Sequence, residues 1–139
     1  MISIEEKINF YKESLDIFDD DMERYKFLLD QSKNAKSFPE EYRKDTFKVS
    51  GCQAQVWLVP YMEDKFLNFH FDSDAFISKG MVTILCDIYG GRKPEEIANT
   101  NFDLLNILNL NNLLTPGRRN GVYSMLMKIK EHAKSRLKN

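Results

Sequence analysis

The segment from Ala75 to Tyr89 constrains the fold more than any other part of the chain, because a helix built from it is apolar over most of its circumference. A helix of this kind is stable in water only when other elements cover it on several sides. Gly90-Gly91 predicts its C-terminal end, and Gly80 inside it predicts close packing against a neighbouring element. The apolar positions are Ile77, Met81, Val82, Ile84, Leu85 and Ile88.

Extended segments precede this helix and predict a sheet that it can cover. Gln55 to Val59 is rich in strand-forming residues, and Phe66 to Phe71 alternates between two faces. Met62 to Lys65 predicts the hairpin connection between them. Phe47 and Val49 alternate with polar residues, which indicates a third, half-buried strand. We expect a small antiparallel sheet of about three strands, with an apolar face that needs a helix layer.

Capping signals predict helices in the rest of the chain. Ser3 and Glu6 form a capping-box pattern before a first amphipathic helix. The acidic run Asp19 to Asp21 ends that helix and can cap a second one, which extends to about Lys33. Short helical segments are predicted near 37–41, at 94–97 and at 100–108, and a long helix follows Thr115-Pro116.

These elements predict an α+β fold in which the small sheet packs against several α-helices. Asp74 is expected to cap the central helix, since the run Asp72-Ser73-Asp74 ends a strand and offers side-chain oxygens to the helix after it. We find no repeat, low-complexity segment or long linker. Residues 1–139 are therefore expected to form a single domain.

Composition excludes several classes of function. The chain has 139 residues, a hydrophobic content of 42% and a net charge of −1, so no global field attracts nucleic acid or an anionic membrane. No apolar window is long enough to span a membrane. The N-terminus lacks the pattern of a secretory signal, so a cytoplasmic location is expected. In that reducing compartment, a disulfide between Cys52 and Cys86 is not expected.

Cys52 is the strongest candidate for a functional residue. It stands between Gly51 and Gln53 at the mouth of a loop between two extended segments. Most isolated cysteines are small core residues, but the neighbours Gly51, Gln53 and Gln55 are not core-forming residues. Cys86, by contrast, falls within the apolar helix and is expected to be a core residue.

Other reactive arrangements lack the residues they require. A zinc site needs about four converging ligands, and the two cysteines and two histidines show no such spacing. A cysteine hydrolase needs a histidine beside Cys52, and only His70 is a candidate. Arg118 and Arg119 lie in the first turn of the last helix, where the helix dipole disfavours cations. Three explanations for these arginines remain open. They could pair with an internal carboxylate such as Asp72 or Asp74, or they could face a partner. The energetic cost could also be too small to need an explanation.

Three motifs together resemble the SufE family, the sulfur acceptor proteins of iron–sulfur cluster assembly. They are GCQAQVWL (Gly51 to Leu58), DSDAFISKG (Asp72 to Gly80) and LTPGRRNG (Leu114 to Gly121). Their order and spacing also agree, and the resemblance extends from about Asp20 to Lys130. One departure is Ala54, where the family often has serine.

The resemblance implies a persulfide relay protein of the SUF system rather than a stand-alone enzyme. Cys52 would accept persulfide sulfur from a cysteine desulfurase of the SufS or CsdA type, stimulate that enzyme, and pass the sulfur to a SufB-type scaffold. Gly51, Gln53 and Gln55 would shape the loop, and Asp74 and Arg118 would help to position or dock it. Pyridoxal phosphate would belong to the desulfurase, with no cofactor or metal in this chain, and the free protein would be a monomer.

Two alternatives differ in class from a sulfur acceptor. An iron–sulfur scaffold of the IscU type would need about three converging ligands, and only Cys52 is a candidate. In a non-catalytic interaction module, Cys52 would be incidental.

Overall fold

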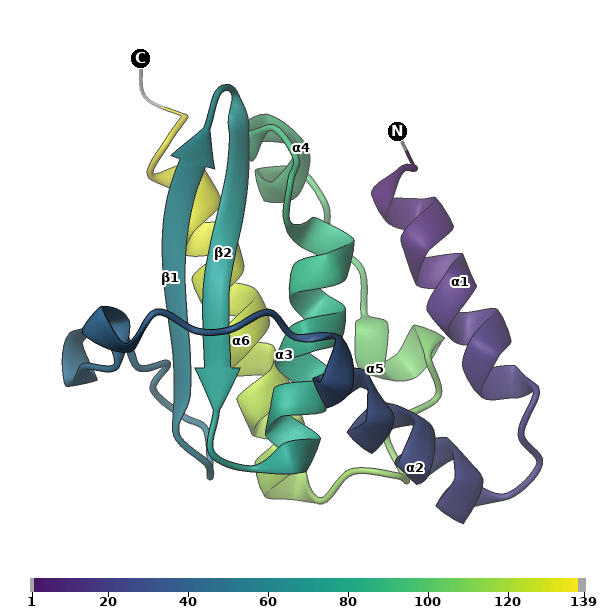
Figure 1. The fold of residues 1–139 in the computed structure, drawn as a ribbon. Helices are drawn as coiled ribbons and strands as arrows, with labels where there is room; N and C mark the ends of the chain where they lie inside the picture. The colour runs from purple at the N-terminus through teal and green to yellow at the C-terminus, as the bar shows by residue number, and fades with distance from the viewer. Residues whose placement is uncertain (1, 138–139) are drawn as a thin grey trace.

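The computed structural model describes residues 2–137 and has the expected α+β architecture, with one antiparallel sheet and helices packed mainly on one of its faces (Figure 1). The helices are α1 (Ile4–Asp16), α2 (Asp21–Asp30), α3 (Phe76–Tyr89), α4 (Pro94–Ala98), α5 (Leu104–Ile107) and α6 (Pro116–Lys134), and the strands are β1 (Val56–Glu63) and β2 (Phe66–Ser73). Short 3-10 turns cover Gln31–Asn34, Glu40–Tyr42 and Asp45–Phe47.

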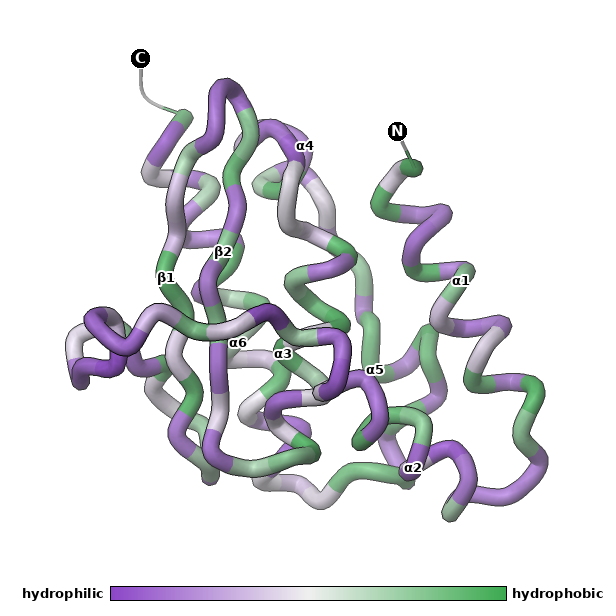
Figure 2. The backbone as a smooth tube through the Cα atoms, in the orientation of Figure 1, coloured by the Kyte–Doolittle hydropathy of each residue, from purple (hydrophilic) through white to green (hydrophobic). Residues whose placement is uncertain are grey.

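Helix α3 is the centre of the molecule, as its sequence predicts. It contacts α1, α2, β2 and α6, and eleven of its residues are buried. Gly80 explains how closely α2 approaches, because a Cβ at this position would lie 2.0 Å from the carbonyl oxygen of Leu28. Hydrophobic and hydrophilic residues alternate along α1, which contacts α3 with one face (Figure 2).

The sheet contains two strands rather than the expected three. β1 and β2 pair from Val56 opposite Ser73 to Glu63 opposite Phe66, without interruption. The expected third strand is reduced to a single bridge between Lys48 and Trp57. A 3-10 turn at Asp45–Phe47 prevents a longer pairing, since its backbone already bonds to itself.

A strap of residues 35–47 crosses the face of the sheet that α3 and α6 do not cover (Figure 1). Trp57 is buried beneath it, although it points away from the main core. The guanidinium of Arg43 lies 4.7 Å from the Trp57 ring centroid and also pairs with Asp72 at 2.8 Å. The strap therefore places Trp57 in a second, smaller buried layer.

Most predicted caps are confirmed, and one is wrong. Ser3 and Glu6 make both bonds of the capping box, and Asp20 and Thr115 cap α2 and α6. Asp74 does not cap α3: Ala75 occupies that position and makes no side-chain cap. The Asp74 carboxylate instead binds the Cys52 loop. No helix within residues 2–137 is both long and apolar enough to cross a membrane.

Candidate functional site

Cys52 lies on a short loop, residues 50–55, whose two ends are held together. The Val49 N–H donates to the Val56 carbonyl at 2.8 Å, which closes the base of the loop. Gly51 has a φ of +90°, a conformation that residues with a Cβ rarely adopt. The expected loop position of Cys52 is thus confirmed, and the turn immediately before it depends on a glycine.

The loop rests on a face of α6 from which side chains are nearly absent. Gly117, Gly121 and Ser124 occupy this face at helical spacing. A Cβ on Gly117 would lie 2.2 Å from the Gln53 side chain, and one on Gly121 would lie 3.5 Å from the Cys52 Sγ. We call these three residues the α6 seat. It allows the loop backbone and the Cys52 side chain to lie directly against the helix.

The thiol of Cys52 is half-buried and is oriented along the α6 seat. Its Sγ donates a long, weak hydrogen bond of 3.6 Å to the Gly121 carbonyl. Burial raises the pKa of the Cys52 thiol above its ordinary value, and the positive charge of Arg118 partly offsets that rise. The thiol form therefore predominates near neutral pH in the free protein, and Arg118 is the cation that favours the thiolate.

Asp74 fixes the other side of the loop through its carboxylate. One carboxylate oxygen accepts from the Gln55 backbone N–H and the other from the Gln55 side-chain amide, each at 2.9 Å. These bonds hold the pKa of Asp74 below its ordinary value, the Gln55 side chain being the largest cause. Asp74 and Gln55 together form a clamp at the end of the Cys52 loop.

The two arginines at the start of α6 do different things, and neither pairs with a carboxylate within the described residues. Arg118 donates to the Ser78 hydroxyl at 2.9 Å, which links α6 to α3 beside the Cys52 loop. Arg119 donates to the carbonyls of Asn111 and Leu114 and holds the turn before α6. Arg118 thus joins α6 to α3 and lowers the pKa of the Cys52 thiol, while Arg119 holds the backbone before α6.

The other reactive arrangements are not assembled around Cys52. His70 stacks between the rings of Tyr42 and Tyr61 on the strap side of the sheet. Cys86 is buried in α3, as expected, and both cysteines are free thiols. Within residues 2–137, no three metal-ligating side chains converge to hold an ion.

The α6 seat is the part of the site that sequence reasoning missed. A signal was present, because glycine in a helix interior costs about 1 kcal/mol relative to alanine. Gly117 and Gly121 lie four residues apart, so they fall on one face of the helix. Two glycines on one face of a helix indicate that another segment approaches that face closely. They do not indicate which segment it is.

The fold and the site define a class: small α+β proteins that present one half-buried thiol on a clamped loop, beside an arginine. Residues 10–133 match the family model described as "SufE: Fe-S metabolism associated domain". The chain therefore belongs to the SufE family.

Individual relatives agree with this assignment. A SufE-like protein of Rhizobium meliloti is 37% identical over 120 residues, which cover 83% of this chain and 86% of the relative. The cysteine desulfuration protein SufE of Wigglesworthia glossinidia brevipalpis is 33% identical over 132 residues, which cover 92% and 90% of the two chains. A solved solution structure of a hypothetical protein from Thermus thermophilus shares the fold, with a TM-score of 0.78 at 18% identity over 96% of this chain and 97% of the other.

Proposed function

We propose that this protein is a sulfur acceptor and carrier that takes persulfide sulfur from a cysteine desulfurase onto Cys52. The observation that carries the proposal is the clamped loop that holds the Cys52 thiol, half-buried, against the α6 seat, with the Arg118 charge lowering the pKa that burial raises. Family membership and the name of the Wigglesworthia relative support a role in sulfur transfer.

The proposed transfer is a thiol–persulfide exchange without net oxidation. The Cys52 thiolate attacks the terminal sulfur of the desulfurase persulfide, and a new S–S bond forms as the old one breaks. The desulfurase cysteine leaves as a thiolate and takes up a proton equivalent to the one that the Cys52 thiol lost, so protons and electrons balance. Removing the persulfide restores the desulfurase nucleophile, which accounts for stimulation of that enzyme.

The residues around Cys52 have distinct positioning roles in this reaction. Gly51 allows the turn, and Gln53 and Gln55 hold the loop at its contacts with α6 and with Asp74. Arg118 stabilises the thiolate and the persulfide anion that forms on the same atom. A partner that displaces Gln55 from Asp74 would release the loop and bring the sulfur within reach of its own cysteine.

The proposal also specifies the partners. The donor is a pyridoxal-phosphate desulfurase of the SufS or CsdA type, and the acceptor is a SufB-type cluster scaffold. Residues 1–139 act as one domain, as a monomer when free, in the cytoplasm. The chain itself contributes a thiol and its positioning groups rather than a cofactor.

Intact mass spectrometry tests the proposal directly. The protein is incubated with a cysteine desulfurase, pyridoxal phosphate and cysteine, and wild type is compared with Cys52→Ser and Cys86→Ser. We expect one added sulfur on wild type and Cys86→Ser, removable by a reductant, and none on Cys52→Ser. Sulfur on Cys52→Ser would move the chemistry to Cys86. No sulfur on any form, with several competent desulfurases, would refute the function.

A further inference from the structure

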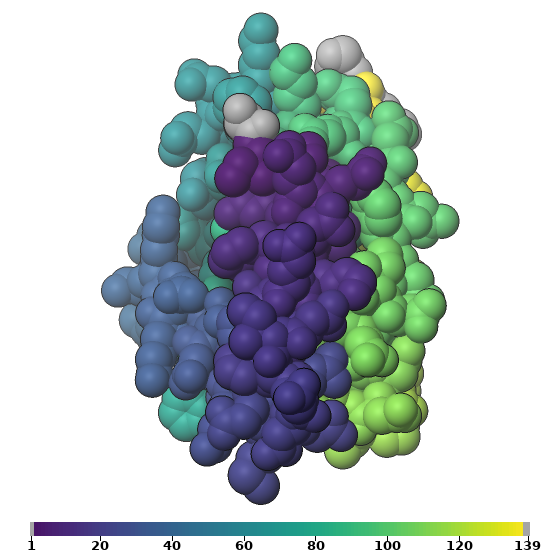
Figure 3. Space-filling view, turned by 90° about the vertical axis from the view of Figure 1, so that its right-hand side faces the viewer, coloured from purple at the N-terminus to yellow at the C-terminus, as the bar shows by residue number. Residues whose placement is uncertain are grey.

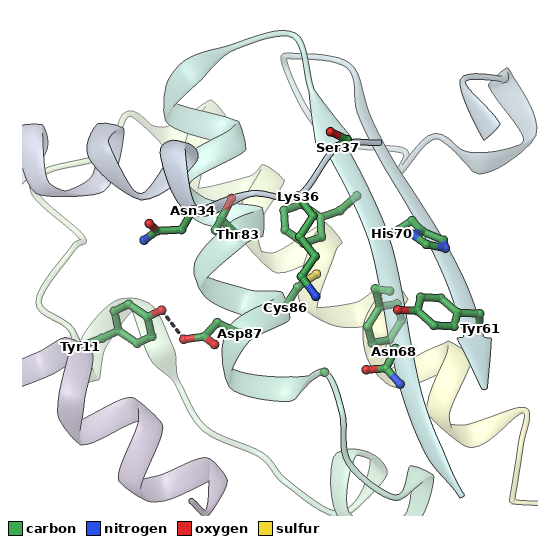
Figure 4. A pocket seen from close by; sticks show the side chains of 13 residues that line it. Tyr11, Asn34, Lys36, Ser37, Tyr61, Asn68, His70, Thr83, Cys86 and Asp87 are labelled. Atoms are coloured by element: carbon green, nitrogen blue, oxygen red, sulfur yellow. Dashed lines mark hydrogen bonds between the residues drawn. The ribbon is translucent and has the colours of Figure 1, made fainter. Parts of the chain in front are cut away.

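A cavity of about 540 Å³ opens beside β2, lined by residues of β2, α3, α1 and the start of the strap (Figure 4). Phe69 and Phe71 of β2 form one wall, Thr83 and Asp87 of α3 lie opposite, and Tyr11 comes from α1. No residue of the Cys52 loop or of α6 lines it. Figure 3 shows the surface hollowed between α1 and the strap.

The wall formed by β2 is a sheet edge that is paired at Leu67 but open at Phe69 and Phe71. Leu67 directs its N–H and its C=O away from β1, to Arg92 and Gly91 respectively, both at 2.8 Å. In an antiparallel pair this direction alternates along the strand, so Phe69 and Phe71 direct the same groups away from β1. The register agrees, because Phe69 lies opposite Pro60, which has no N–H to donate. Within residues 2–137, no backbone group pairs with Phe69 or Phe71 on that side.

Each edge of the sheet is covered at one end only. Val49 and Lys48 pair with Val56 and Trp57 on the β1 edge, and Arg92 and Gly91 pair with Leu67 on the β2 edge. Beyond these ends the two edges differ, because β1 contains Pro60. The β2 edge carries no bulge, and its central sequence Phe66 to Phe71 contains no lysine, proline or acidic residue. Proteins ordinarily protect an open edge with such features, because an unpaired strand is a template for another chain.

The charges around the cavity favour an acidic occupant. Asp87 is already engaged by the Lys7 ammonium at 3.1 Å and by the Tyr11 hydroxyl. Lys36 lines the same cavity and is exposed, and within the described residues it makes no ion pair. The Lys36 ammonium is thus a positive charge at this cavity that is free to pair with a carboxylate of an occupant.

We propose that the β2 edge and this cavity form a peptide-binding site, separate from Cys52, for an extended acidic segment of a partner protein. The segment adds to the sheet by backbone hydrogen bonds to Phe69 and Phe71, and one of its carboxylates pairs with Lys36. In this mode of recognition, main-chain bonds supply the affinity and side-chain contacts supply the selectivity. The site does not depend on sulfur transfer, so either proposal can fail alone.

NMR titration of the ¹⁵N-labelled protein tests this site with the peptide acetyl-Val-Glu-Val-Glu-Val-Glu-amide. We expect saturable shifts at the Phe69 and Phe71 amides, together with slower hydrogen exchange at both. A peptide of the same sequence, N-methylated at alternate residues, lacks the pairing N–H groups and should not bind. Lys36→Glu should weaken binding about fivefold, which is the scale of one exposed ion pair. Lys33→Glu, with the same charge change outside the cavity, is the matched control.

Three outcomes would overturn the proposal. The first is the absence of shifts at millimolar peptide, because backbone pairing depends little on the peptide side chains. The second is equal binding of the N-methylated peptide, which would show that strand addition is not involved. The third is a concentration-dependent shift of Phe69 and Phe71 without peptide, which would assign this edge to a second copy of the chain.

Discussion

Cys52 and Cys86 are the same residue type in two environments that differ in access and in charge. Cys52 lies on a clamped loop, half-buried, with Arg118 as the charge that lowers its pKa. Cys86 lies within α3, 9% exposed, and both burial and Asp87 raise its pKa. Burial raises the pKa of both thiols, so neither cysteine is a strongly activated thiolate in the free protein. Access and a nearby cation, rather than activation, distinguish the proposed sulfur carrier.

The largest expected difference between the two thiols is in alkylation rate. We expect iodoacetamide to modify Cys52 at least about 10-fold faster than Cys86, because Cys86 is 9% exposed, is reached only through the cavity beside β2, and has a pKa raised by burial and by Asp87. Peptide mapping of protein alkylated for increasing times measures both rates in one sample. The unfolded chain is the control, in which the two rates should converge. Comparable rates in the folded protein would remove the distinction between the sites.

The second difference is in the effect of substitution on protein stability. Here the larger effect is expected at Cys86 and the smaller one at Cys52. Cys86→Ser buries a hydroxyl among apolar side chains and should lower the free energy of unfolding by about 1–3 kcal/mol. Cys52→Ser lies on a loop and should change it by less than about 0.5 kcal/mol. Urea unfolding of the two variants measures both values. A larger loss for Cys52→Ser would give its thiol a structural role.

The third prediction concerns the pH dependence of the Cys52 thiol. Because its pKa is raised, its alkylation rate should still be rising with pH where an ordinary cysteine has levelled off. Arg118→Gln removes the charge that lowers this pKa, so the profile should move to higher pH and the neutral rate should fall about two- to fivefold. Arg119→Gln is the matched control and should leave the profile in place. An unchanged profile for Arg118→Gln would separate Arg118 from the thiol.

The smallest expected effects distinguish two glycines of the α6 seat. Gly117→Ala places a Cβ within 2.3 Å of the Gln53 side-chain amide carbon, so Gln53 must move and its contact with α6 is lost. Gly121→Ala places a Cβ 3.5 Å from the Cys52 Sγ, an ordinary contact. Cys52 alkylation should rise about twofold in Gly117→Ala and stay equal or fall in Gly121→Ala, because only the first variant displaces Gln53 and loosens the loop. The same rate in both would show that Gln53 does not hold the loop.

Much of the fold could be predicted because its signals are local. The apolar circumference of α3, the capping box at Ser3 and the Thr115-Pro116 start of α6 each depend on neighbours within one or two helical turns. The loop position of Cys52 followed in the same way from Gly51 and from the strand after it. A third strand was also predicted from local alternation. That prediction was wrong, because residues Asp45–Phe47 form a 3-10 turn instead.

The tertiary structure alone decided which distant groups meet. Asp74 was predicted as a helix cap from its position, but its carboxylate binds Gln55, which is 19 residues away. Gly121 meets Cys52 across 69 residues, and Trp57 is covered by a strap whose path no periodicity reveals. The sequence determined the helices, the hairpin and the thiol on its loop, because backbone propensity and hydrophobic period act over a few residues. Only packing could select among the possible long-range contacts, since those depend on the distances that the whole folded chain sets.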